Sequence, residues 1–133
     1  MGLTDADHAE YGNPSQNYLV VPVTCAVPHR TDGAPKLSGA CPVRILPGTR
    51  LYAAYGREEV SEEFFCNYEV NPEYREALEQ AGLRVSAVGE AGEVRAVELP
   101  GRRFFVATLF QPQLGPPSHP VIAAYLDAIA TSS

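Results

Sequence analysis

Short apolar runs, broken by glycine and proline, recur along the chain and predict a strand-rich fold. The runs predicted as strands cover residues 17–24, 41–46, 63–70, 84–88, 93–99 and 104–110. An alanine- and glycine-rich turn joins the fourth and fifth runs, which indicates a hairpin. Pro22 lies inside the first run, and because proline cannot donate to a strand ladder, we expect an edge strand or a bulged strand there.

Three segments carry helix signals. Residues 51–55 predict a short helical turn that ends at Gly56. Asn71 and the proline after it suit the N-cap and first position of a second helix, which Gly82 closes. Ser118 is the expected cap of the last helix. The side chains expected to face the core are Tyr74, Ala77, Leu78 and Ala81 in the second helix, and Val121, Ile122, Tyr125, Leu126 and Ile129 in the last.

The most apolar run, residues 104–110, predicts a buried central strand. Gln111 and Gln113 follow at a spacing of two, so the end of this strand presents two polar side chains. Residues 1–17 and 28–40 are rich in polar and turn-forming residues, which indicates an irregular lead-in and a long loop. Strands outnumber helices, and the pattern favours one α/β or α+β domain with a mixed sheet.

The composition argues against several classes of protein. A chain of 133 residues is long enough for one domain with a hydrophobic core. The formal net charge of −6, with no Lys/Arg-rich run, disfavours a nucleic-acid or anionic-membrane surface. No apolar run reaches the roughly 18 residues of a membrane-spanning helix, and the acidic, polar start is unlike a signal peptide. We therefore expect a cytoplasmic protein with neither nucleic-acid nor membrane partners.

The three cysteines form no CxxC pair and are odd in number, so in a reducing compartment we expect free thiols. A metal site built from them and the histidines stays open as an alternative, although the spacings match no familiar zinc pattern. The residues available for such a site are Cys25, Cys41, Cys66, His8, His29 and His119. We expect neither a metal nor a cofactor.

Several segments, in order along nearly the whole chain, resemble the C-terminal glutamine amidotransferase domain of CTP synthase. They are Leu46–Thr49, Ala54–Gly56, the YEVNPEYR phrase at Tyr68–Arg75, Leu78–Leu83, Glu98–Pro100, the FFVAT strand at Phe104–Thr108, and His119–Pro120. The chain is also similar to the CTP synthase C-terminal region-related (seleno)proteins. The resemblance implies an incomplete class I glutamine amidotransferase-like (flavodoxin-like) α/β domain over residues 1–133, with a mixed β-sheet and flanking helices.

In an amidotransferase, a cysteine thiolate attacks the glutamine amide and a carboxylate-oriented histidine moves the proton. The nucleophile normally sits in a glycine-rich elbow, and none of the three cysteines has such flanks. By resemblance, the nucleophile half of the family domain would fall before Met1. We expect that half to be absent, with two explanations open: a natural short form, or a longer homologue that has lost its first half.

The second departure from the family lies at the end of the 104–110 run. The family carries a histidine and a glutamate at the positions of Gln111 and Gln113, in a phrase like FFVATQFHPEF. A glutamine amide has no pKa near neutrality and cannot serve as a general acid or base. Asn67 stands where a family arginine helps to hold the glutamine carboxylate, and asparagine cannot replace that bidentate contact. We therefore predict that the chain does not hydrolyse glutamine.

The remodelled pocket supplies the candidate site residues. Candidates for catalysis are Cys66, Gln111 and Gln113, and candidates for substrate binding are Asn67, Tyr68 and Glu69. A purely structural role stays open as the alternative for each of these residues. In it, Cys66 is a small buried hydrophobic residue, the two glutamines form hydrogen bonds within a loop, and His119 lies in the first turn of a helix or caps it.

Two functions follow from these candidates. The first is a non-catalytic amidotransferase homologue that binds a small molecule or acts as an accessory protein. The second is an enzyme with new chemistry in the old pocket, in a biosynthetic pathway for example, using the region of Cys66 and Gln111. Absent strands would leave a sheet edge or face exposed, so we also expect a homodimer.

Overall fold

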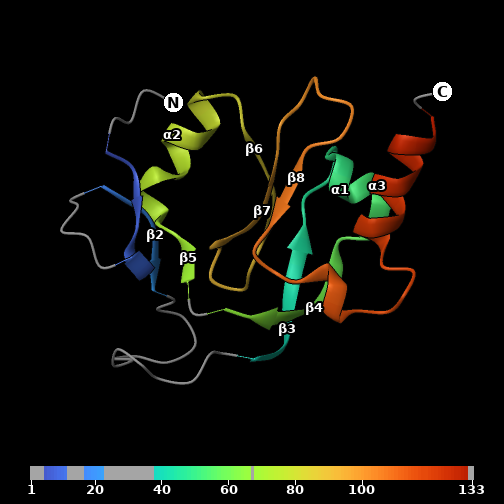
Figure 1. Ribbon diagram of the computed structural model, residues 1–133, viewed down its shortest axis with the longest axis horizontal. Coiled ribbons are helices and arrows are strands. Elements are labelled where there is room, and N and C mark those ends of the chain that lie inside the picture. The colour runs from blue at the N-terminus through green and yellow to red at the C-terminus, as the bar shows by residue number, and fades with distance from the viewer. Residues whose placement is uncertain (1–4, 12–16, 23–37, 67, 132–133) are drawn as a thin grey trace.

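The computed structural model describes residues 5–11, 17–22, 38–66 and 68–131, which form two β-sheets flanked by three α-helices (Figure 1). The strands are β1 (Asp7–His8), β2 (Tyr18–Pro22), β3 (Ser38–Ile45), β4 (Glu59–Phe65), β5 (Tyr68–Val70), β6 (Arg84–Val88), β7 (Val94–Glu98) and β8 (Val106–Thr108). The helices are α1 (Arg50–Tyr55), α2 (Arg75–Gln80) and α3 (Pro120–Ala130), with 3-10 turns at Ala9–Tyr11, Pro72–Tyr74 and Pro112–Leu114. The predicted α/β class is confirmed.

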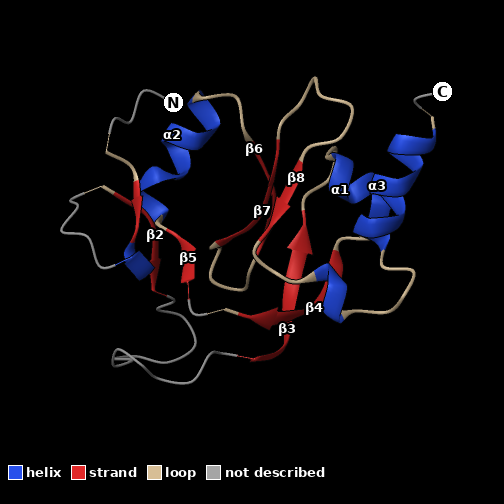
Figure 2. Cartoon of the chain, viewed as in Figure 1, coloured by secondary structure: helices blue, strands red, loops and turns tan. Residues whose placement is uncertain are grey.

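The larger sheet has the strand order β4-β3-β6-β7-β8, and each neighbouring pair is antiparallel (Figure 2). The predicted hairpin is present as β6 and β7. The smaller sheet has the order β1-β2-β5. Its β1–β2 pair is parallel and its β2–β5 pair is antiparallel, so this sheet is mixed. In this sheet β2 is the middle strand, so the edge-strand alternative is wrong, whereas the β1–β2 register shifts by one residue between Tyr18 and Val20, as the bulged alternative predicts. Pro22 is tolerated because it is the last residue of β2.

The run at residues 63–70 is divided between the two sheets, where the sequence predicted one strand. β4 ends at Phe65 and pairs with β3, whereas β5 begins at Tyr68 and pairs with β2. The division follows from two separate cores. Phe64 lies in the main cluster, and Val70 packs against a second cluster on the other side of the larger sheet. One straight strand could not reach both.

Helices α1 and α2 start and end largely as the sequence predicts. The Thr49 side chain accepts from the backbone of Tyr52, and Gly56 closes α1 with a φ of 68°. The Asn71 side chain accepts from the N–H of Glu73, as an N-cap should. The first turn after Asn71 is nevertheless 3-10, and the α-helical part, α2, begins three residues later.

The run at residues 104–110 is not the buried central strand that the sequence predicts. β8 spans three residues and lies at the edge of the larger sheet in the described part of the chain. The apolar side chains of the run go to different places. Phe110 is buried in the main cluster, Phe104 packs against Tyr125 of α3 with ring centroids 5.5 Å apart, and Phe105 is exposed.

Helix α3 also differs from its prediction. Its N-cap is His119, whose ring nitrogen accepts from the N–H of Val121, where the sequence pointed to Ser118. Val121 packs on the main core, as expected. Tyr125, Leu126 and Ile129 were expected to face the core, but they are about half exposed. The larger sheet and α1 have already filled that core, so among the described residues the outer face of α3 packs on this chain only in part, through the contact of Tyr125 with Phe104.

Candidate functional site

Gln111 lies where the edge strand β8 returns to β4. Its backbone N–H donates to the carbonyl of Glu63 (2.9 Å), and its side-chain Nε2 donates to the carbonyl of Phe65 (3.3 Å). The Gln111 side chain is therefore hydrogen-bonded to the end of β4, which is the structural role of a loop hydrogen-bonding residue. This contact also places Gln111 beside Cys66, which directly follows Phe65 and is partly exposed.

Gln113 faces a different part of the molecule. It lies in the exposed turn after β8 and lines a groove of about 510 Å³ between this turn, β8 and α3. Cys66 and Gln111 are not among the residues that line this groove. The structure thus places Gln111 against the residue before Cys66 and places Gln113 on another surface.

The three candidates for substrate binding have separate environments. Asn67 lies outside the described residues. Tyr68 is the first residue of β5, and its ring lies 4.9 Å from the ring of His8 and is tilted to it. Glu69 is buried in the smaller sheet, opposite Val21. Tyr68 and Glu69 therefore sit on the small sheet, and their side chains point to opposite faces of β5.

A buried polar cluster at the base of α3 was not predicted as a site. The His119 Nε2 lies 2.8 Å from a carboxylate oxygen of Glu62, and the Tyr55 hydroxyl donates to the other oxygen at 2.5 Å. His119 and Glu62 are both buried. The sequence carried a signal for this cluster: Glu62 shares the inward-facing alternation of β4 with Phe64.

The hydrogen bonds of His119 fix its tautomer and its role. Nδ1 accepts from the N–H of Val121 (3.2 Å), so it carries no proton, and Nε2 carries the proton that Glu62 accepts. Both ring nitrogens are therefore occupied inside the protein. His119 caps α3 and is positioned by Glu62, which agrees with the capping alternative drawn from the sequence.

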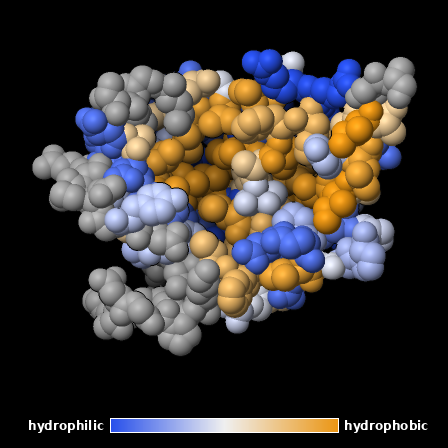
Figure 3. Space-filling view, in the orientation of Figure 1, coloured by the Kyte–Doolittle hydropathy of each residue, from blue (hydrophilic) through white to orange (hydrophobic). Residues whose placement is uncertain are grey.

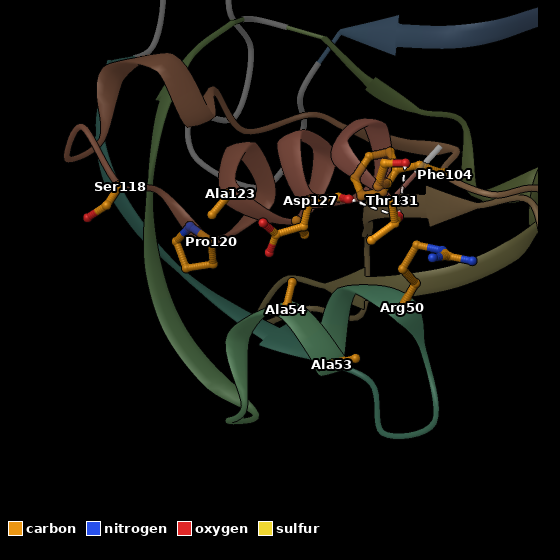
Figure 4. A pocket seen from close by; sticks show the side chains of 11 residues that line it. Arg50, Ala53, Ala54, Phe104, Ser118, Pro120, Ala123, Asp127 and Thr131 are labelled. Carbon is orange, nitrogen blue, oxygen red and sulfur yellow. Dashed lines mark hydrogen bonds between the residues drawn. The ribbon is translucent and has the colours of Figure 1, made fainter. Parts of the chain in front are cut away.

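A second groove, of about 590 Å³, separates α1 from α3 (Figure 4). Ala54 of α1 points toward Asp127 of α3 across it, whereas the Arg50 guanidinium points away from Asp127, at the Phe104 end of the groove. Its wall is rich in alanine, and Arg50 and Asp127 are the charged residues that line it. The Arg50 guanidinium donates to the carbonyl of Arg102 at 3.0 Å and lies over the Phe104 ring, so it is engaged at one end of this small-residue surface.

Metal and membrane features were sought in the described residues. No group of three or more His, Cys, Asp or Glu side chains there could hold a metal ion. None of the described helices is long and apolar enough to cross a membrane.

Comparison with known proteins identifies the fold and its relatives. No family model matches the chain. CTP synthase from Aeropyrum pernix is 42% identical over 142 residues, covering 98% of this chain and 25% of the relative. CTP synthase from Saccharolobus solfataricus is 35% identical over 135 residues, again covering 98% of this chain and 25% of the relative.

A solved structure decides the architecture. The glutaminase domain of Trypanosoma brucei CTPS, with bound acivicin, superposes with a TM-score of 0.87 at 31% identity, covering 99% of this chain and 53% of that one. The chain is a glutamine amidotransferase-like domain that resembles the C-terminal part of CTP synthase. This confirms the resemblance drawn from the sequence. The chain spans about a quarter of the length of the two CTP synthases and about half of the solved chain.

The Tyr55–Glu62 contact of this amidotransferase-like domain makes stability depend on pH in the alkaline range. Burial, followed by the hydrogen bond to Glu62 and its charge, raises the pKa of the Tyr55 hydroxyl above its ordinary value of 10.0. The folded protein therefore keeps this proton at a pH where the unfolded chain releases it. Its contribution to stability is complete below about pH 10 and declines as the pH rises further.

We expect the free energy of unfolding to fall more steeply above about pH 10 in the natural protein than in Tyr55→Phe, which has no hydroxyl to titrate. Urea denaturation at a series of pH values measures both curves. The other tyrosines are present in both proteins, so their effect on the free energy of unfolding cancels when one curve is subtracted from the other. Parallel curves above pH 10 would show that Tyr55 is not held neutral by its surroundings.

Proposed function

We propose that this domain does not hydrolyse glutamine and that it acts as a small-molecule-binding or accessory protein built on the amidotransferase fold. The observation that carries the proposal is the pair Gln111 and Gln113 at the end of β8. These are the positions where the resembling family places the histidine and glutamate that move the proton. Two amides cannot take up and return a proton near neutral pH.

The nearby histidine does not supply the missing base. His119 is 2% exposed, and its two ring nitrogens are engaged with Glu62 and with the N-terminus of α3. A general base must reach the proton that it abstracts, directly or through one water molecule. The hydrogen bonds of His119 support a structural role in place of that one.

The substitution at position 67 supports the same conclusion independently of the acid–base residues. Asparagine there offers one amide, whereas the arginine of the resembling family offers a charged, forked pair of donors for the substrate carboxylate. The loss of a charge-assisted contact of this kind lowers affinity for an amino-acid carboxylate. Free glutamine should therefore bind weakly or not at all.

Ligand-induced stabilisation tests this proposal. L-glutamine at about 100 mM, roughly 100 times the upper end of usual KM values, is expected to leave the melting temperature unchanged. Acivicin, which is bound in the solved Trypanosoma brucei domain, is expected to do the same. A ligand at 100 times its Kd would stabilise the fold by about 2.7 kcal/mol, so binding would be visible. The Trypanosoma brucei domain with acivicin is the positive control, and a saturable rise in the melting temperature of this chain would contradict the expected loss of glutamine binding.

A further inference from the structure

We draw no further inference here: the strongest candidate, the apolar face that the β8 edge and the outward side of α3 present (Figure 3), carries none, because the chain spans about half of the solved domain that it matches and nothing in the structure shows what covers this face.

Discussion

Replacing His119 with alanine is expected to lower the free energy of unfolding by about 2–4 kcal/mol, made up of about 1–3 kcal/mol for a buried acceptor left without its donor and about 1 kcal/mol for a lost helix cap. The change leaves the carboxylate of Glu62 buried with the Tyr55 hydroxyl as its remaining partner from the cluster. It also removes the side-chain cap from the N–H of Val121 and opens a cavity beside Phe110, whose ring centroid lies 6.4 Å from that of His119. All three effects act in the same direction.

Urea denaturation measures this loss, with an unchanged m-value as the sign that only stability has changed. His119→Asn is the matched control because asparagine is a good N-cap. It should recover the capping part of the loss but not the contact with Glu62. Glu62→Gln should cost less than His119→Ala, because the amide keeps the shape and can still accept from His119 Nε2. A loss below about 1 kcal/mol for His119→Ala would mean that the cluster does not support the fold.

Local signals in the sequence predicted the local features of the fold. The Asn71-Pro72 pair predicted the start of a helix, and Gly56 predicted the end of another. The turn between the 84–88 and 93–99 runs predicted a hairpin. Each of these depends on residues close together in the chain, where backbone preferences act directly. The family resemblance then supplied the overall fold, which no local pattern specifies.

Features that depend on distant contacts were not predicted. Apolarity marked residues 104–110 as buried, but their position at the sheet edge is decided by β7 alone pairing with β8 among the described strands. The 63–70 run reads as one strand because its division depends on two cores that only the folded chain separates. The face of α3 that points outward depends on how much of the core α1 and the larger sheet already fill.

The sequence supplied the residue types of the candidate site, and the structure supplied their arrangement. The proximity of Gln111 to Cys66 follows from the return of the chain to β4, and the separate surface of Gln113 follows from the 3-10 turn after it. Neither could be drawn from spacing alone. The His119–Glu62 pair joins residues 57 positions apart, so the sequence showed each partner without showing the contact. Burial of a glutamate on an inward-facing strand position was the available signal.

The second large effect concerns catalysis. Loss of a general acid–base residue typically lowers an enzymatic rate by about 10²–10⁴-fold, and in this chain glutamines occupy both positions at the end of β8. We therefore expect ammonia release from L-glutamine by this chain to equal the buffer blank, while the Trypanosoma brucei glutaminase domain, assayed in parallel, turns over. A variant with Cys25, Cys41 and Cys66 replaced by serine is the control for ammonia release. Release that depends on a thiol of this chain is lost in the variant, whereas release by a contaminating enzyme is not.

Ammonia release from L-glutamine, measured over a range of protein concentrations, is the direct test of the claim that the amidotransferase reaction is absent here. The account predicts no release above the blank from either the natural chain or its cysteine-free variant. Saturable release that rises with the concentration of the natural chain, and that disappears in the cysteine-free variant, would contradict it.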